Sequence, residues 1–269
     1  MTAMTCAAWP ARACRRTIVI PAMPGRLRPQ PSFRQGGHHM SKASTVLIVG
    51  ASRGLGLALA EEYCRRGARV IATVRGPSPA LDALRARHPD TLAIETGIDM
   101  ADADSARLLR ERLGTRRLDI LFVNAGIARS IGLTPGNAPE ADFLEMMRVN
   151  AFSPVRLIEG LEDGVEPDGT IAIMSSELAS IANNPGGWDL YSASKAALNM
   201  LVKCHLAHRP GNRRAVLLVA PGWVRTEMGG EEASLSIEES IPKVVEMVER
   251  NRGKAGLRFV DRFGETLPW

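Results

Sequence analysis

The chain has 269 residues, of which 45% are hydrophobic and 23% are charged. This is the composition of a folded globular domain, which excludes a fibrous or wholly disordered protein. Its longest apolar runs fall well short of the roughly 18 residues that a membrane-spanning helix needs. Four cysteines, without the spacing of a metal site or of a secreted disulfide framework, predict reduced thiols and a cytoplasmic location, with no bound metal.

The formal net charge of +5 comes from the start of the chain. Residues 1–39 hold six arginines and no lysine or acidic residue, so residues 40–269 carry a net charge of −1. Such a body has no excess positive charge for a nucleic-acid backbone. Five prolines oppose the amphipathic helix of a transit peptide, which is the weaker alternative for this segment. We expect 1–39 to be a disordered or misassigned N-terminal extension, with Met40 as the alternative start.

Beyond Ser44, short β-branched runs alternate with amphipathic stretches. The predicted strands cover 45–49, 69–74, 91–98, 118–123, 170–174, 215–219 and 258–260. The predicted helices cover 54–66, 79–87, 103–113, 141–159, 192–207 and 237–249. Alternation of this kind predicts a parallel sheet with helices on both faces, so that residues 40–269 form one doubly wound α/β domain of the Rossmann type.

A glycine-rich loop, Gly50-Ala51-Ser52-Arg53-Gly54-Leu55-Gly56, joins the first predicted strand to the first helix. Glycines let the chain turn sharply and let its backbone approach a pyrophosphate closely, while the helix N-terminus receives the anion. The spacing is G-x-x-x-G-x-G rather than the commoner G-x-G-x-x-G. Because it lies between a strand and a helix, this loop predicts a dinucleotide site in preference to a plain tight turn.

The end of the second predicted strand indicates which dinucleotide binds. It has no acidic residue to bind the ribose 2′-hydroxyl of NAD, and it ends at Arg75. The guanidinium groups of Arg53 and Arg75 can pair with a 2′-phosphate, although both arginines would also be ordinary solvated side chains. The sequence therefore predicts NADP(H) in preference to NAD(H).

The chain contains two tyrosines, and one of them has a lysine four residues later. On a helix this spacing places Tyr191 and Lys195 on one face, whereas Tyr63 has no lysine at that offset. An ammonium group beside a phenol lowers the phenol pKa from its usual value near 10. Ser175 and Ser176 end the fifth predicted strand, at the edge of the sheet where a serine hydroxyl can hold a substrate carbonyl.

From about Thr45 onwards the sequence resembles the short-chain dehydrogenase/reductase family. The glycine loop matches the phosphate loop of that family, and Tyr191 with Lys195 matches its Tyr-x-x-x-Lys signature. The resemblance implies four catalytic residues, namely Asn150, Ser176, Tyr191 and Lys195. It also implies cofactor contacts at Gly50, Ser52, Arg53, Gly54, Leu55, Gly56, Arg75, Asp99, Met100, Asn124, Ala125, Gly126, Tyr191, Lys195, Pro221, Gly222, Val224 and Thr226.

The sequence departs from the family pattern at three places. Val49 and Val123 replace a threonine and an asparagine, changes that bear more on the stability of the sheet than on chemistry. The family serine lies 13 residues before the tyrosine, a position that Leu178 occupies here, whereas Ser176 lies 15 residues before it. A longer loop through 183–188 restores this register, and we therefore choose Ser176 over Ser175.

That loop, the sequence at 228–230 and the segment 263–269 are similar to the C-factor-like subgroup of the family. The resemblance implies reversible hydride transfer between NADP(H) and a small carbonyl or alcohol substrate, in a homodimer or homotetramer. The C-factor is a bacterial intercellular signal, so the alternative is a signalling or scaffold protein that keeps the fold without essential turnover. Trp188 and Trp223 would line the mouth of a substrate site or simply pack.

Overall fold

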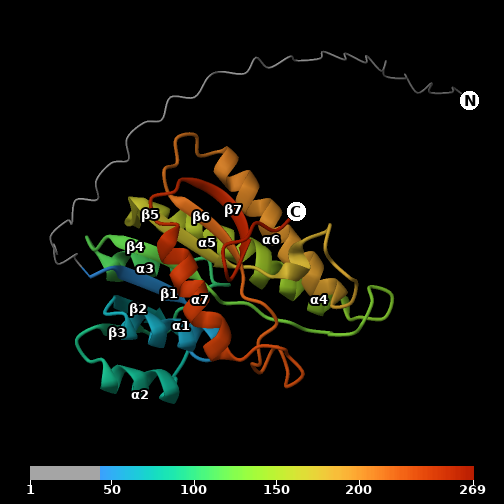
Figure 1. Cartoon of the computed structure of the whole chain (residues 1–269), viewed down its shortest axis with the longest axis horizontal. Helices are drawn as coiled ribbons and strands as arrows, with labels where there is room; N and C mark the ends of the chain where they lie inside the picture. The colour runs from blue at the N-terminus through green and yellow to red at the C-terminus, as the bar shows by residue number, and fades with distance from the viewer. Residues whose placement is uncertain (1–42) are drawn as a thin grey trace, which may run out of the picture. The chain divides into compact units, whose positions relative to one another are not determined.

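A computed structural model describes residues 43–269, so the extension predicted for 1–39 and the start at Met40 lie outside the described residues. The described chain forms one parallel sheet in the order β3-β2-β1-β4-β5-β6-β7 (Figure 1). Its strands are β1 (Thr45–Val49), β2 (Arg69–Thr73), β3 (Leu92–Glu95), β4 (Leu118–Val123), β5 (Val165–Met174), β6 (Ala215–Ala220) and β7 (Gly256–Asp261). The strand order reverses between β1 and β4, where ligands bind in sheets of this kind.

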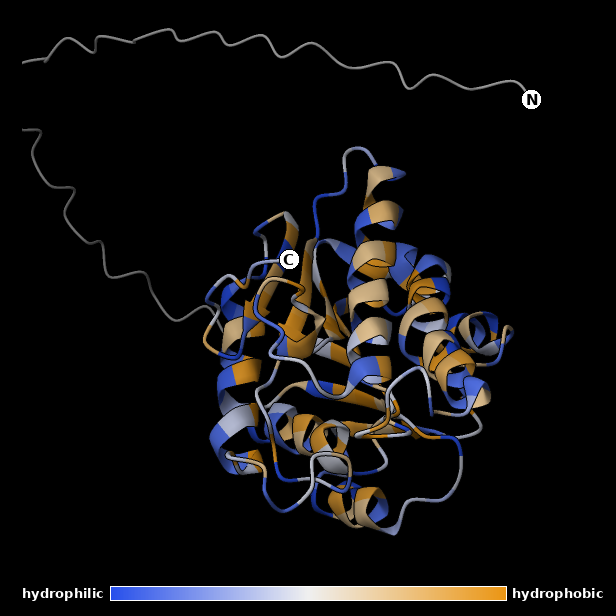
Figure 2. Ribbon diagram, turned by 90° about the vertical axis from the view of Figure 1, so that its right-hand side faces the viewer, coloured by the Kyte–Doolittle hydropathy of each residue, from blue (hydrophilic) through white to orange (hydrophobic). Residues whose placement is uncertain are grey.

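Helices cover both faces of the sheet. One face carries α1 (Gly54–Arg65), α2 (Pro79–Arg87) and α7 (Ile237–Arg250). The other face carries α3 (Ser105–Leu113), α5 (Ser153–Leu161) and α6 (Asp189–Ala207), with α4 (Glu140–Met146) packed beside α6. Figure 2 shows a central sheet that is largely hydrophobic between helices of mixed hydropathy. This is the doubly wound α/β architecture that the sequence predicts.

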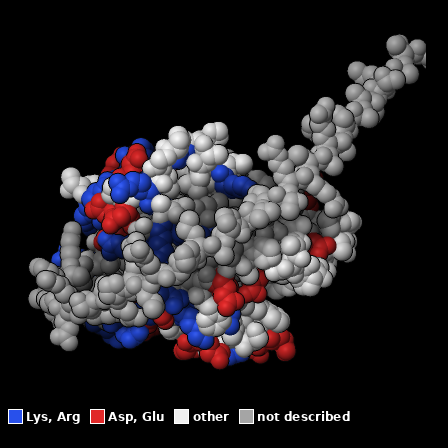
Figure 3. All heavy atoms as spheres, turned by 45° about the horizontal axis from the view of Figure 1, so that its top comes forward, with Lys and Arg blue, Asp and Glu red and all other residues white. Residues whose placement is uncertain are grey.

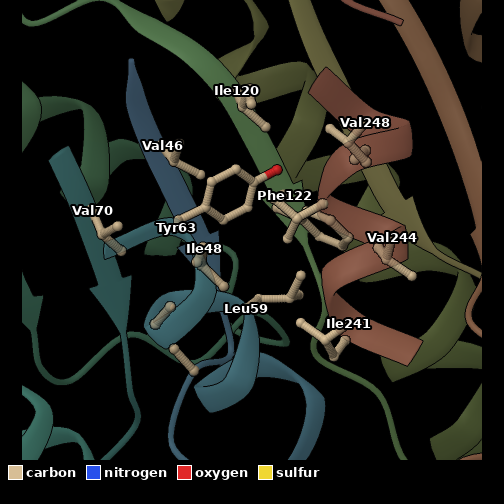
Figure 4. Packing of buried hydrophobic residues seen from close by; sticks show 14 of the residues in the cluster. Val46, Ile48, Leu59, Tyr63, Val70, Ile120, Phe122, Ile241, Val244 and Val248 are labelled. Carbon is tan, nitrogen blue, oxygen red and sulfur yellow. The ribbon is translucent and has the colours of Figure 1, made fainter. Parts of the chain in front are cut away.

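Each face of the sheet has its own hydrophobic core. Each strand contributes side chains to both cores, because successive side chains point to opposite faces. Val46 and Ile48 of β1 pack with α1 and α7, where Tyr63 of α1 is fully buried (Figure 4). Leu47 and Val49, the alternate residues of the same strand, pack on the face of α3, α5 and α6. Continuous apolar strands such as this one are typical of a sheet buried on both sides.

Two strands differ from the prediction by more than two residues at one end, and the others agree within two residues. The third strand is Leu92–Glu95 rather than 91–98, because the chain turns at Gly97, whose φ is +73°. The fifth strand begins at Val165, before the predicted residue 170, and pairs with β4 through an irregular register between Leu118 and Ile120. The first part of this strand includes a short polar stretch with Pro167 and Gly169, so it lacks the apolar pattern by which a strand is predicted.

The continuous α-helix predicted for 141–159 is wrong in its middle. A π-helical segment, Met147–Phe152, separates α4 from α5, and the amide of Ser153 donates to the carbonyl of Arg148 five residues earlier. Pro154 gives the physical reason, since it has no amide hydrogen for the carbonyl of Asn150 and its ring would crowd that carbonyl. The segment therefore widens by one residue at Asn150.

The surface and the helices of the described chain agree with its composition. Acidic and basic side chains lie next to one another on the face that Figure 3 presents, as expected where the net charge is near zero. Within residues 43–269, no helix is both long enough and apolar enough to cross a membrane.

Candidate active site

The residues singled out in the sequence meet at one edge of the sheet. Gly50 follows β1, Asn124 follows β4, Ser175 follows β5 and Pro221 follows β6. Because the strands are parallel, all of these positions lie at the carboxyl edge, on both sides of the point where the strand order reverses. The site therefore comes from segments that are far apart in the sequence.

The glycine loop is held between the ends of β2 and β4, with no room for a side chain at Gly50 or Gly56. The Gly50 amide donates to Thr73 Oγ1 over 3.2 Å, and Asn124 Nδ2 donates to the Gly50 carbonyl over 2.8 Å. A Cβ on Gly50 would lie 2.7 Å from Ala125 Cβ, and one on Gly56 would lie 2.0 Å from the Gly50 carbonyl oxygen. Glycine is thus required for packing as well as for the left-handed φ of +87° at Gly50.

This loop fits a pyrophosphate. Arg53 is the N-cap residue of α1 but its side chain does not cap the helix, and the first turn of α1 holds no acidic residue. The amides at the start of α1 are therefore available to an anion, which the helix dipole also favours. The carbonyl of Ser52 accepts a hydrogen bond of 2.8 Å from the hydroxyl of Ser78, which ties the loop to the start of α2.

The residues expected at the adenosine end lie after β2 and β3. Arg75 is exposed, Asp99 is exposed and Met100 is buried. The Asp99 carboxylate accepts a hydrogen bond of 2.9 Å from the amide of Ala101, which fixes the turn that follows β3. Arg53 forms an ion pair of 2.6 Å with Glu227.

Asn150 lies fully buried behind the Asn124–Gly126 segment. Its side-chain amide donates to the Ile127 carbonyl (2.8 Å) and to Ser194 Oγ (3.0 Å), and its Oδ1 accepts from the Ile127 amide (2.8 Å). A Cβ on Gly126 would lie 3.3 Å from Asn150 Oδ1 and 3.5 Å from Lys195 Nζ. These contacts bring Asn150, Gly126 and Lys195 into one cluster.

Tyr191, Lys195 and Ser176 come together between β5 and α6. Lys195 Nζ lies 5.8 Å from the centre of the Tyr191 ring and donates to the carbonyl of Met174 over 2.9 Å. The hydroxyl of Ser176 lies near the Tyr191 phenol and acts to lower its pKa. Ser175, in contrast, is buried and donates to Asn199 Oδ1 over 2.7 Å. The hydroxyl beside the tyrosine is therefore that of Ser176.

Burial dominates the titration of this pair. It raises the pKa of Tyr191 to about 12, while the hydroxyl of Ser176 acts in the opposite direction. It lowers the pKa of Lys195 to about 8. The sequence predicted a lowered pKa for Tyr191, which is wrong for this structure because desolvation of the phenolate outweighs the lowering by Ser176. At neutral pH the tyrosine is a protonated phenol.

The segment that begins with Pro221 lies close to the glycine loop. The Pro221 carbonyl accepts a hydrogen bond of 2.7 Å from the buried Ser240 hydroxyl, and Val224 forms a β-bridge with Leu235. Gly222 has a φ of +85°, and a Cβ there would lie 2.5 Å from Leu235 Cδ1. A Cβ on Gly54 would lie 3.8 Å from Thr226 Cγ2. The structure thus places Thr226 beside the glycine loop.

The two tryptophans differ in their surroundings. Trp188, at a φ of +55°, lies edge-on to Tyr191 with 5.6 Å between the ring centres. Trp223 is about half exposed, and its indole donates to the Gly229 carbonyl over 2.8 Å. Trp188 therefore borders the site, while Trp223 fixes the segment after Gly222.

Sequence reasoning missed two residues of the site. The hydroxyl of Ser194 accepts from Asn150 and donates to the Tyr191 carbonyl over 2.7 Å, so it links two helices. Glu227 pairs with Arg53. Ser194 lies between Tyr191 and Lys195 in the chain, but a serine on a helix carries no signal of its own. Glu227 and Arg53 are far apart in sequence, and only the fold brings them together.

Comparison with known proteins identifies the family. A family model described as short chain dehydrogenase matches residues 44–235. A Burkholderia multivorans protein assigned to the short-chain dehydrogenases/reductases, solved with bound NADP, is 46% identical with a TM-score of 0.82, over 85% of this chain and 100% of that one. A carbonyl reductase from Pseudomonas aeruginosa PAO1 in complex with NADP is 43% identical with a TM-score of 0.79, over the same shares.

A curated relative supports the subgroup. C-signal of Myxococcus xanthus is 30% identical over 158 residues, which are 58% of this chain and 95% of C-signal. This similarity agrees with the C-factor-like features of the sequence. Because the family model covers more than half of the chain and the fold is the same, the chain belongs to the short-chain dehydrogenase/reductase family.

Proposed function

We propose that the protein is an NADP(H)-dependent oxidoreductase that moves a hydride reversibly between the nicotinamide and a small carbonyl or alcohol substrate. The observation that carries this proposal is the convergence of Ser176, Tyr191 and Lys195 at the same sheet edge as the glycine loop. Relatives that share 43–46% of their residues with this chain were solved with NADP, which supports the choice of cofactor.

NADP(H), when bound, supplies or takes up the hydride, and the chain provides the groups that hold it. Amides at the start of α1 receive the pyrophosphate, and Arg53 and Arg75 pair with the 2′-phosphate. Asp99 and Met100 would hold the adenine. The segments Asn124–Gly126 and Pro221–Thr226 complete the cofactor site on its two sides.

The catalytic groups have separate tasks in the reduction direction. Ser176 holds the carbonyl oxygen and Tyr191 donates a proton to it, for which a neutral phenol is the required form. Lys195, in its charged form, stabilises the phenolate that remains. Asn150 holds a proton-relay water through its backbone carbonyl, because its side chain is committed to Ile127 and Ser194.

We also propose a homodimer or homotetramer built on the face of α4 and α6. Leu144, Phe152 and Met200 are 57%, 55% and 59% exposed on elements that pack against one another. Burying such side chains against a second copy removes apolar surface from water. A cytoplasmic location fits the thiols of Cys64 and Cys204, which form no disulfide within the described residues.

Titration of the full chain with NADPH and with NADH, followed by nicotinamide fluorescence, tests the cofactor. We expect NADPH to bind at least tenfold more tightly, since each charge-assisted contact with a 2′-phosphate is worth about 1.5–3 kcal/mol. Equal affinities for NADPH and NADH would contradict the roles of Arg53 and Arg75 but would not contradict the proposed reductase activity. If a folded protein binds neither nucleotide, the cofactor assignment fails.

Replacement of the proposed proton donor tests the reaction. Tyr191→Phe is expected to abolish turnover in a screen of carbonyl compounds while NADPH affinity stays within about threefold, because the phenol contacts the reacting oxygen. Tyr63→Phe is the matched control, since Tyr63 lies buried in the other core. Full activity of Tyr191→Phe would refute the assignment. NADPH binding without turnover of any carbonyl would favour the signalling alternative.

A further inference from the structure

A turn in the segment between β6 and α7 lies against the glycine loop. Thr226 holds this turn, since its Oγ1 accepts from the Gly229 amide over 3.0 Å and its carbonyl accepts from the Gly230 amide over 2.9 Å. The methyl group of Thr226 faces Gly54, as described above. The side chain of Glu227 is thereby held at the start of α1.

Glu227 uses this position to pair with the cation of the glycine loop. Its Oε2 lies 2.6 Å from Nη1 of Arg53. Both side chains are mostly exposed, 74% for Glu227 and 72% for Arg53, so the pair lies in water and is easily exchanged for another partner. Arg53 is also the guanidinium that the proposed function assigns to the 2′-phosphate.

We infer that Glu227 determines how tightly NADP(H) is held, by competing with the 2′-phosphate for Arg53. This inference rests on the proposed function. If Arg53 leaves Glu227 on binding, the free energy of the ion pair is lost. If Arg53 keeps both partners, the carboxylate repels the phosphate across a short distance. In both cases Glu227 weakens binding of NADP(H) and leaves NAD(H), which lacks that phosphate, unaffected.

The expected effect is modest and specific. An exposed ion pair contributes about 0.2–1 kcal/mol, which corresponds to roughly 1.4- to 5-fold in affinity. Arg75, the second cation, forms no ion pair among residues 43–269 and remains free for the phosphate. Glu227 thus weakens one of the two contacts with the 2′-phosphate. Weaker binding speeds release of the oxidised cofactor, which matters in enzymes where this release limits turnover.

The test compares NADPH and NADH affinity in the full-length Glu227→Gln variant at low ionic strength. We expect NADPH to bind roughly 1.4- to 5-fold more tightly and NADH to bind as in the unmodified protein. Glu231→Gln removes the same charge from the same segment and serves as the control, with little effect on either nucleotide. In the background of Arg53→Gln, the Glu227→Gln change is expected to have a smaller effect, because competition for the shared partner is gone and only direct repulsion of the phosphate remains.

Each other outcome has a definite meaning. Equal loss of NADPH and NADH affinity in Glu227→Gln would overturn the inference and make the ion pair a latch between the turn and the glycine loop. Unchanged affinity for both nucleotides would make it an ordinary surface pair. Both results leave NADP(H) binding by the unmodified protein intact, whereas failure of that protein to bind either nucleotide would overturn the proposed function and the inference with it.

Discussion

At the scale of single residues, the burial of Lys195 lowers the stability of the folded state. Its side chain is 3% exposed, and its ammonium nitrogen donates to the Met174 carbonyl. Removing a charge from water is expensive, which is why the pKa of Lys195 falls to about 8. A lysine at this place therefore lowers the stability of the fold, which its proposed role beside Tyr191 explains.

This cost predicts a pH-dependent stability difference for Lys195→Met. Below pH 8 the lysine is charged in both states, so the folded state bears the full penalty of the buried charge. Between pH 8 and 10.5 the unfolded state binds more protons, and the unmodified protein therefore gains stability as the pH rises. Relative to the variant, this gain is on the order of 2 kcal/mol from pH 7 to pH 10.

Denaturant unfolding at several pH values measures the difference for Lys195→Met. Lys254→Met, which changes an exposed lysine, is the control and is expected to show no such trend. A difference between the variant and the unmodified protein that stays constant from pH 7 to pH 10 would show that the ammonium group of Lys195 is not desolvated.

At the scale of elements, the junction of β1, the glycine loop and α1 is closely packed. Gly56 lies so near the Gly50 carbonyl and Asn124 Nδ2 that a Cβ would be 2.0 Å and 2.6 Å from them. The π-helical segment at Met147–Phe152 is a second local departure from regular geometry, and it places Asn150. Both irregularities lie next to the proposed chemistry, where such departures are commonly found.

The close packing predicts a large effect of Gly56→Ala. The added methyl group must displace the loop backbone, so NADPH affinity is expected to fall more than tenfold and the melting temperature to drop by several degrees. Gly164→Ala is the control, because a Cβ there meets nothing within 4 Å. Fluorescence titration and thermal unfolding measure the two effects. Normal NADPH affinity in Gly56→Ala would show that this loop does not hold the pyrophosphate.

At the scale of the whole molecule, one exposed face combines apolar side chains from elements that also carry site residues. Phe152 lies two residues from Asn150, and Met200 lies on the same helix as Tyr191. Contact with a second copy would therefore restrain the two elements that carry the proposed catalytic groups. Association and activity are expected to be linked for this reason.

Phe152→Glu tests this face by placing a charge in the proposed contact. We expect sedimentation to show a shift from dimer or tetramer to monomer, together with reduced turnover, because an unpaired buried charge is strongly disfavoured. Phe263→Glu adds the same charge at another exposed phenylalanine, beside α7, and should leave association unchanged. An unmodified protein that sediments as a monomer would refute the proposed oligomer.

Much of the fold was predictable because it follows from local patterns in the sequence. Apolar runs of strand length, capping residues and glycines define nearly all of the elements, and their alternation specifies a parallel sheet with helices on both faces. The Tyr191–Lys195 spacing and the glycine loop are likewise local, since each lies within one helix turn or one strand–helix junction. The sequence by itself therefore determined the family, the architecture and most of the candidate residues.

The tertiary structure decided what depends on contacts between distant segments. The loop register favours Ser176 over Ser175, but only the structure shows what each hydroxyl contacts: Ser175 donates to Asn199, whereas Ser176 lies near Tyr191. The raised pKa of Tyr191 follows from burial, which no local pattern encodes. The pairing of Arg53 with Glu227 joins residues from opposite ends of the domain. The direction of a side chain, the loss of water around a buried group and the pairing of charges distant in sequence all depend on tertiary packing. They are set only when the sheet brings the carboxyl ends of its strands together.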